Sequence, residues 1–236
     1  MYELWYWPSL PGRGEFPRLA LEAGGIPYRD MAREAGEEGF AALEADMDRT
    51  RGDPPFAPPY LIADGIVIGQ AANILLFLGE RHGLAPSNPA GRLWVHQCQL
   101  TIADMVTEAH DTHHPVSMGD YYEDQKTEAK RRAADFRDAR IPKFLGWFDR
   151  ILAQRGDWLA GGGWSYADLS LFHLIAGLRH AFPRRMATVA RDVPRVIALH
   201  DRVAALPALA DYLASERRLR FNQEGIFRHY PELDGE

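Results

Sequence analysis

The chain has 236 residues, of which 46% are hydrophobic and 25% are charged. This composition is typical of soluble globular proteins and excludes disordered, collagen-like and coiled-coil chains, and the length favours two lobes over one domain. The formal net charge of -6, with basic residues scattered along the chain, gives no basic field for nucleic acid.

The chain contains one cysteine, Cys98. A single thiol allows no intramolecular disulfide, no Cys-x-x-Cys redox pair and no thiolate metal site, and this fits a reducing compartment. The sequence opens without a basic leader, and no segment approaches about 18 consecutive apolar residues. We therefore expect a cytoplasmic protein that does not enter a membrane.

The hydrophobic period changes repeatedly over residues 1–83, which predicts alternating strands and helices. The predicted elements are a strand over residues 2–7, a helix over 13–23, a strand over 26–29, a helical segment over 40–47, a hairpin with strands over 60–62 and 66–68, and a helix over 71–82. The Asp64-Gly65 turn between β-branched runs is a strong hairpin signal. The first lobe is thus predicted to have the order βαβα followed by ββα.

The second lobe, residues 91–236, follows a short linker rich in proline and glycine, with the boundary near residue 85. Helical patterns occur over residues 92–116, 122–155, 166–182, 193–205 and 208–217. Pro142 is expected to break or kink the second of these helices. The third is apolar nearly all round, so we expect it to be the buried central helix of an all-α lobe.

A capping box opens this central helix at Ser165-Tyr-Ala-Asp168. The serine hydroxyl and the aspartate carboxylate of such a box satisfy N–H groups that the first helical turn leaves unpaired. We expect a structural role for both residues.

Three histidines, His110, His113 and His114, share one helix face by their i, i+3 and i+4 spacing. No HExxH spacing or cysteine partner accompanies them, and a proline follows directly, so a polar lining or a solvated face is favoured over a metal site. Cys98 lies in mid-helix and is expected to be buried and inert. The charges of residues 135–140 are expected to form a solvated helix face.

The segment before the predicted hairpin contains Pro58-Pro59. A proline in this place is either a cis residue or a simple strand stop, and the sequence alone favours the stop because cis X–Pro bonds are the minority. The helix that begins near Gln70 and Ala71 has free N–H groups that suit a carboxylate. An ordinary strand-to-helix turn is the more common reading of such a segment.

Together these residues resemble the cytosolic glutathione transferases that use a tyrosine, which include the alpha, mu, pi and sigma classes. The resemblance covers almost the whole chain and rests on Tyr6-Trp7-Pro8, Gly12–Arg18, Pro59-Tyr-Leu before Asp64-Gly65, Gln70, Asp104, residues 140–145, Trp158–Gly161 and Ser165–Asp168. It implies a thioredoxin-like glutathione-binding domain over residues 1–83, an all-helical domain over 91–236 that supplies the electrophile site and dimer contacts, and a detoxifying homodimer.

The resemblance also implies the roles of particular residues. Tyr6 would donate its phenol hydrogen to the glutathione sulfur, and Pro59 would be cis, with the backbone before it pairing with the cysteinyl unit. Gln70 and the N–H of Ala71 would hold the γ-glutamyl carboxylate, and Asp104 would reach across the dimer to the γ-glutamyl ammonium. The implied glutathione-binding set is Trp7, Arg13, Pro58, Pro59, Gln70, Ala71 and Asp104, with no metal.

The sequence departs from the family pattern at three places. Position 71 is alanine where serine or threonine is usual, and Pro58 has no N–H to donate to the cysteinyl carbonyl. The loop after Tyr6 is one residue longer, so Ser9 or Arg13 is an alternative partner for the sulfur. Two functions stay open: conjugation of glutathione to small hydrophobic electrophiles, and non-catalytic ligand binding or assembly on the same fold.

Overall fold

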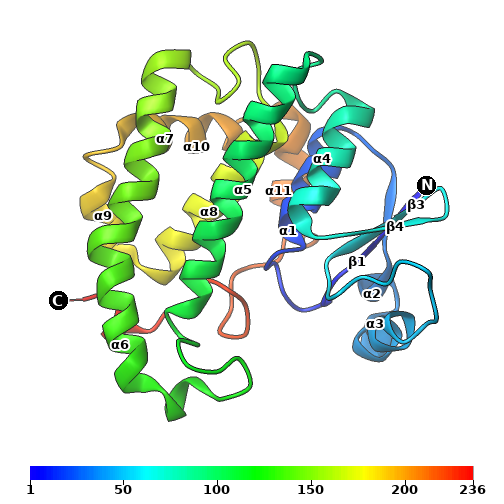
Figure 1. Cartoon of the computed structure of the whole chain (residues 1–236), viewed down its shortest axis with the longest axis horizontal. Coiled ribbons are helices and arrows are strands. Elements are labelled where there is room, and N and C mark those ends of the chain that lie inside the picture. Colours follow the sequence, from blue (N-terminus) through cyan, green and yellow to red (C-terminus); the bar gives the residue numbers. More distant parts are fainter. Residues whose placement is uncertain (236) are drawn as a thin grey trace.

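The computed structural model describes residues 1–235, and its N-terminal part is built on a four-stranded sheet (Figure 1). The strands are β1 (Tyr2–Trp5), β2 (Tyr28–Asp30), β3 (Tyr60–Ala63) and β4 (Ile66–Gly69), in the order β2-β1-β3-β4. β1 pairs with β2 in parallel, while the β1–β3 and β3–β4 pairs are antiparallel. The expected hairpin is present, and its turn residues Asp64 and Gly65 both have positive φ, as a two-residue turn of this kind requires.

Helices cover both faces of this sheet. α1 (Glu15–Ala23) and α4 (Ala71–His82) pack on the face that presents Leu4 and Leu61, whereas the short α2 (Met31–Glu34) and α3 (Gly39–Met47) pack on the face of Trp5 and Tyr60. Successive side chains of a strand point to opposite faces, which is why neighbouring residues serve different cores. The predicted order of elements is confirmed, and the sheet with its helices is the thioredoxin-like domain that was expected.

The rest of the chain is helical. Its helices are α5 (Pro89–Asp111), α6 (Lys126–Asp135), α7 (Ile141–Arg155), α8 (Tyr166–Ala181), α9 (Pro183–Val189), α10 (Pro194–Ala204) and α11 (Ala210–Ala214). The expected domain division falls in the segment between the end of α4 and the start of α5. Periodicity alone did not reveal α9, and it predicted a longer α11.

α5 ends at Asp111, although the pattern predicted helix to residue 116. The N–H groups of Thr112 and His113 donate hydrogen bonds to the carbonyls three residues earlier, and this tightens the last turn of the helix. Pro115 then disfavours a helical conformation at His114. The helix therefore stops just where the three histidines lie.

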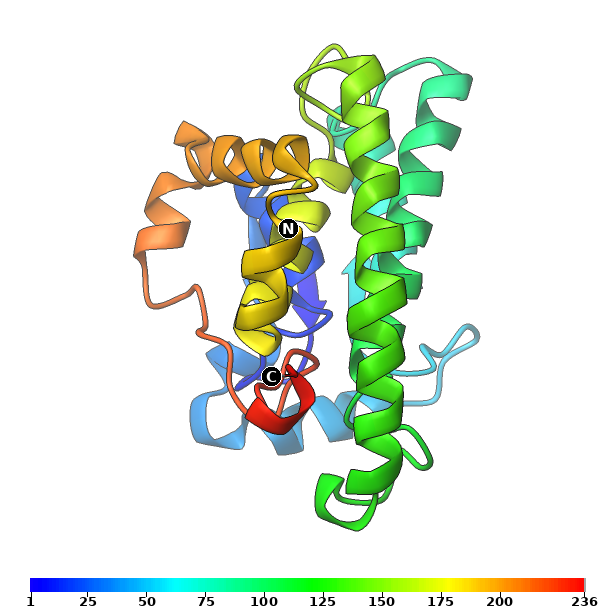
Figure 2. The ribbon, with the colours of Figure 1, turned by 90° about the vertical axis from the view of Figure 1, so that its left-hand side faces the viewer.

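α6 and α7 form one long column (Figure 2), with a π-helical turn over Phe136–Arg140 between them. Pro142 lies in the first turn of α7 and has no N–H to donate to the π-helical turn before it. The predicted interruption is thus a widened turn just before Pro142 rather than a break in the column.

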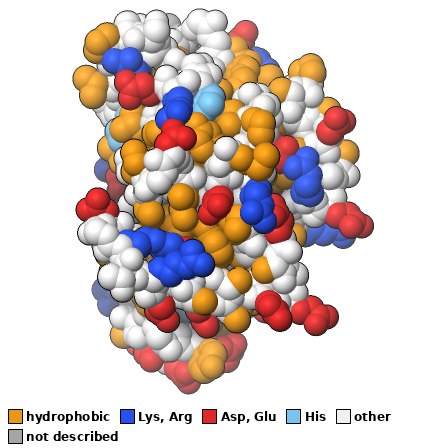
Figure 3. Space-filling model, turned by 90° about the vertical axis from the view of Figure 1, so that its right-hand side faces the viewer, with side chains coloured by type: hydrophobic (Ala, Val, Ile, Leu, Met, Phe, Trp, Pro, Cys, Tyr) orange, Lys and Arg blue, Asp and Glu red, His pale blue; other side chains and the backbone are white. Residues whose placement is uncertain are grey.

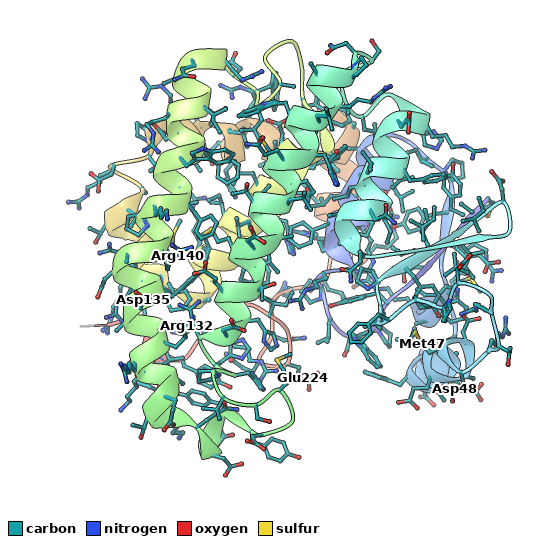
Figure 4. All side chains as sticks on the ribbon, viewed as in Figure 1. Met47, Asp48, Arg132, Asp135, Arg140 and Glu224 are labelled. Atoms are coloured by element: carbon teal, nitrogen blue, oxygen red, sulfur yellow. The ribbon has the colours of Figure 1, made fainter. Side chains whose placement is uncertain are left out.

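Arg132 and Arg140, which Figure 4 labels on this column, both bind Glu108 of α5. The distances are 3.2 Å from Arg132 Nη2 and 2.6 Å from Arg140 Nη2 to carboxylate oxygens of Glu108. Arg137 donates to the carbonyl of Leu233 at 2.8 Å. The expectation of a solvated face over residues 135–140 is therefore wrong for Arg137 and Arg140. Arg140 connects the column to α5, and Arg137 connects it to the C-terminal segment.

The central helix α8 is buried along its length, as predicted. Asp168 Oδ2 accepts hydrogen bonds from the Ser165 N–H at 2.8 Å and from its hydroxyl at 2.7 Å, and Oδ1 accepts one from the Leu159 N–H at 2.9 Å. Burial raises the pKa of Asp168 to about 6. The capping box is confirmed, and its carboxylate also fixes the loop before the helix.

A buried group of charges joins α1 to the C-terminal part of the chain. Glu15 and Arg18 are both fully buried and face each other at 3.6 Å. Arg18 Nε binds Asp30 at 2.6 Å, while Glu15 accepts hydrogen bonds from the Tyr212 hydroxyl at 2.7 Å and from Arg218. Each buried charge in the group therefore has an opposite charge beside it, as burial of ions requires.

Two further expectations concern membrane-spanning helices and the reactivity of Cys98. Within residues 1–235, none of the helices has the length and apolar content needed to cross a membrane. Cys98 is fully buried, and burial raises the pKa of its thiol to about 12, so it is inert at neutral pH as predicted.

Candidate functional site

A cavity of about 350 Å³ lies between the sheet domain and α5. Five of the residues expected to bind glutathione line it: Arg13, Pro58, Pro59, Gln70 and Ala71. The facing wall comes from α5 and is mostly apolar, with Ile102, Ala103 and Val106 among its side chains. The structure thus brings together residues that lie far apart in the sequence. On the sheet-domain side the polar side chains are Arg13 and Gln70, which lie among apolar ones, and the α5 side is mostly apolar.

The peptide bond between Pro58 and Pro59 is cis. This is what the resemblance implied, and the sequence-only preference for a simple strand stop was wrong. Pro58 is half-buried in the cavity wall and, being proline, offers a carbonyl but no N–H at this place.

The start of α4 forms the polar end of the cavity. Gln70 precedes the helix with φ of 68°, and the first intrahelical bond runs from the Ile74 N–H to the Gln70 carbonyl. The N–H groups of Ala71, Ala72 and Asn73 therefore lack intrahelical acceptors, and the positive end of the helix dipole lies with them. This geometry suits an anionic group at the cavity wall.

Tyr6 follows β1 directly and is buried, with 4% of its surface exposed. Its hydroxyl oxygen accepts a hydrogen bond from the backbone N–H of Arg13 at 2.9 Å. Burial raises the pKa of the phenol, so the group stays protonated at neutral pH. The hydroxyl therefore accepts from Arg13 and keeps its own proton for another acceptor.

The loop that contains Gly12 and Gly14 lies directly on the Tyr6 ring. A Cβ atom at Gly12 would collide with the Tyr6 hydroxyl, and one at Gly14 would collide with the ring. Only glycine allows this approach. As a result, Arg13 lines the cavity while Tyr6 lies behind the loop and is not part of the cavity wall.

Two other residues of the expected set also lie outside this cavity. Trp7 packs against Phe40, with ring centres 5.9 Å apart, beside the core that α2 and α3 form with the sheet. Asp104 is exposed on α5, and its side chain is outside the cavity wall of its own chain. Ser9 is exposed, and its carbonyl accepts a hydrogen bond from the Asn222 side chain at 3.0 Å.

Sequence reasoning missed two polar residues near the cavity. Gln99 of α5 is 2% exposed and lines the cavity, and its Oε1 has no hydrogen-bond partner among residues 1–235. His173 of α8 is fully buried, and its Nε2 lies 3.3 Å from the Gly12 carbonyl, so it supports the loop over Tyr6 from below. A polar residue on an otherwise apolar helix was the only sequence signal for His173.

The three histidines lie together where α5 ends. His113 is 1% exposed, so a solvated face is wrong for this residue, while His110 and His114 are half-buried. Burial lowers the pKa of His110 and of His113 to about 3. All three imidazoles therefore belong to a buried or partly buried polar group, as the polar-lining alternative anticipated.

The strand order, the cis-proline wall and the helical lobe against it define a glutathione transferase fold. The family model described as glutathione S-transferase, C-terminal domain, matches residues 110–216. Over 214 residues the chain is 28% identical to hematopoietic prostaglandin D synthase of Gallus gallus, covering 90% of this chain and 94% of that one. It is 27% identical over 184 residues to glutathione S-transferase 1 of Ascaris suum, covering 77% and 82% of the two chains.

A solved structure of prostaglandin synthase D of Nilaparvata lugens superposes with a TM-score of 0.72 at 20% identity, covering 94% of this chain and all of that one. At 20% identity this match supports the fold alone. Together, the family model, the two sequence matches and this shared fold make the chain similar to the cytosolic glutathione S-transferases.

Proposed function

We propose that the protein joins the thiolate of glutathione to small hydrophobic electrophiles. The similarity to glutathione S-transferase 1 of Ascaris suum supports glutathione transferase activity in general. The observation that carries the finer proposal is the cavity itself, which sets the cis-proline segment and the N-terminus of α4 opposite an apolar wall of α5. The first wall suits a polar tripeptide, and the second suits an apolar acceptor.

The cis-proline segment and the start of α4 would hold glutathione in an extended form. The γ-glutamyl carboxylate would accept hydrogen bonds from the Ala71 N–H and the Gln70 side chain at the positive end of α4. The backbone at Pro58 would run beside the cysteinyl unit as an added strand does. Because Pro58 has no N–H, only its carbonyl is available to that pairing.

The thiol must lose its proton to react, and free thiols titrate near pH 8.5, so the site must favour the anion. The Tyr6 phenol would do this by donating its hydrogen to the sulfur, since its oxygen is already engaged by the Arg13 N–H. The thiolate then attacks the electrophilic carbon, the new C–S bond forms, and the displaced group leaves with its electron pair.

We also propose a homodimer. Phe56, Leu93 and Leu100 are large apolar side chains that are 93%, 72% and 47% exposed. The face shown in Figure 3 carries apolar side chains across its middle, with charged ones between and around them. A second copy packed over Phe56, Leu93 and Leu100 would bury these side chains, and Asp104 of the partner subunit would then face the γ-glutamyl ammonium.

The acceptor would be held by α5 and the C-terminal segment. Met118 lines the cavity just beyond the end of α5. The bond from Asn222 to the Ser9 carbonyl holds the C-terminal segment against the loop after Tyr6. Residues 9–11, 110–122 and 221–227 are therefore our candidates for the acceptor side.

One observation favours the non-catalytic alternative. The Gly12–Gly14 loop separates the Tyr6 hydroxyl from the cavity, so a ligand bound there without loop movement would lack this donor. A carrier of this fold would bind glutathione with its thiol still protonated.

The decisive experiment is a glutathione titration followed by calorimetry and by the ultraviolet band of the bound thiolate at neutral pH. S-methylglutathione is the control, because it has no ionisable sulfur. Saturable binding, a thiolate band and conjugation of an activated aryl halide are the expected results. Binding without a thiolate band and without conjugation would favour the carrier. No glutathione binding by calorimetry would overturn both conjugation and a glutathione carrier.

A further inference from the structure

The imidazoles of His110, His113 and His114 form a nearly equilateral triangle at the end of α5. Their ring centres are 4.8 Å apart for His110 and His113, 4.9 Å for His110 and His114, and 4.7 Å for His113 and His114. One ring nitrogen from each residue lies within 4.8 Å of the others. Three imidazoles therefore present ring nitrogens to the same small volume.

These spacings match those of imidazoles that share a metal ion. Tetrahedral Zn²⁺ bound by three histidines at Zn–N of ~2.0–2.1 Å holds their ring centres about 5 Å apart. The observed separations differ from this value by a few tenths of an ångström. The ring nitrogens lie within 4.8 Å of one another, and ligands around a tetrahedral ion are about 3.3–3.4 Å apart, so the rings would rotate to bind one ion.

The hydrogen bonding of His113 also fits a histidine that binds a metal ion. Its Nε2 lies 2.8 Å from the carbonyl of Ile226, which can only accept, so Nε2 carries the hydrogen and Nδ1 carries a lone pair. Metal-binding histidines are commonly oriented by such a bond to a carbonyl. The oriented Nδ1 lies 2.6 Å from His114 Nδ1, and His114 donates this hydrogen bond. An ion shared by the two atoms would replace that hydrogen and hold the nitrogens about 3.3–3.4 Å apart.

The Ile226 carbonyl belongs to the C-terminal segment. Figure 4 labels its neighbour Glu224 close to the end of α5. The triangle is thus built by two parts of the chain that lie more than a hundred residues apart.

We propose that these three histidines bind one divalent transition-metal ion of the Zn²⁺, Co²⁺ or Ni²⁺ class. Three imidazoles leave a fourth tetrahedral position, which water would occupy. The group consists of imidazoles without a carboxylate, whereas hard cations such as Mg²⁺ and Ca²⁺ bind mainly through oxygen ligands. Neutral nitrogen donors suit the transition metals instead.

The test is a titration of chelator-treated protein with Co²⁺, without glutathione, because the glutathione thiol itself binds such ions. We expect one Co²⁺ per chain, the visible d–d bands of tetrahedral coordination, and loss of these bands when Zn²⁺ is added. His110→Ala and His114→Ala should each weaken Co²⁺ binding by more than about tenfold.

The matched control is His96→Ala, which removes a half-buried histidine from the same helix α5. This variant should bind Co²⁺ as the wild type does. Circular dichroism and melting temperatures establish that all variants fold. The proposal is overturned if folded wild-type protein gives no tetrahedral bands, if His110→Ala and His114→Ala keep full affinity, or if His96→Ala loses as much affinity as they do.

Discussion

The backbone N–H of Arg13 points at the hydroxyl oxygen of Tyr6 across 2.9 Å. This bond joins a residue of the cavity wall to a side chain that the wall conceals. It fixes the direction of the phenol and leaves its proton free, so any ligand sulfur that reaches the hydroxyl does so next to Arg13.

Replacing Tyr6 by phenylalanine should raise the pKa of bound glutathione and slow conjugation. A hydrogen bond to a charged partner contributes about 1.5–3 kcal/mol, which corresponds to one to two pKa units. Spectroscopic titration of the bound thiol measures the shift, and Trp7→Phe is the control. If the Tyr6→Phe titration overlays that of the wild type, Tyr6 has no role at the sulfur, and Ser9→Ala and Arg13→Ala are the next variants to titrate.

Replacing Gly14 by alanine should displace the Tyr6 ring while leaving the phenol itself unchanged. The new Cβ would collide with the Tyr6 ring, and overpacking of this kind costs about 1–3 kcal/mol of stability. We expect a lower melting temperature together with slower conjugation. Gly163→Ala is the control, because a Cβ there meets open space. Equal melting temperatures for the two variants would contradict the close packing of the loop on Tyr6.

The buried carboxyl of Asp168 predicts a pH dependence of stability. Its pKa of about 6 in the folded chain lies above the ordinary unfolded value of ~3.9. Folding therefore takes up a proton between these two values, and the group's contribution to stability falls as the pH rises from about 4 to about 6. The total change is about 3 kcal/mol.

Urea unfolding of wild type and Asp168→Asn across this range checks the prediction. The wild type should lose more stability than the variant as the pH rises, because asparagine does not titrate. Asp168→Asn should also be less stable at every pH, since its amide nitrogen replaces one oxygen and cannot accept either the bonds from Ser165 or the bond from Leu159. Parallel pH profiles would show that the Asp168 pKa is not raised.

Replacing Pro58 by valine should tighten glutathione binding up to about tenfold. Valine supplies the backbone N–H that proline lacks, and one net hydrogen bond contributes about 0.5–1.5 kcal/mol. The unfolded chain gains freedom at the same time, which lowers stability by roughly 0.4–1 kcal/mol. Calorimetric titration and melting temperatures separate the two effects, with Pro54→Val in the same loop as control. Weaker binding would mean that the ligand does not run antiparallel to this segment.

Local signals in the sequence predicted local structure well. The Asp64-Gly65 turn and the Ser165–Asp168 box depend on residues within four positions of each other, so their geometry follows from their identities. The βαβ order followed in the same way from hydrophobic period. The family resemblance added the cis bond before Pro59, which the residues alone did not favour.

Other features depend on partners that are distant in the sequence. The path of the Gly12–Gly14 loop hides Tyr6, and only packing determines that path. Arg140 meets Glu108 thirty-two residues away, and His113 is oriented by a carbonyl 113 residues further on. The spacing of the three histidines predicted that they share one helix face, but it contains no information about these distant partners, so the burial and orientation of His113 could not be predicted.

The buried charges of α1 make the two lobes depend on each other for folding. Glu15 receives the Tyr212 hydroxyl and the Arg218 guanidinium from the far end of the chain, and breaking a buried pair by removing one partner costs about 3–5 kcal/mol. In an excised sheet domain, Glu15 and Arg18 would be exposed to water, together with the apolar face of α1 beside them. Thermal unfolding of the whole chain should therefore be a single cooperative transition, with no stage at which the sheet domain stands alone.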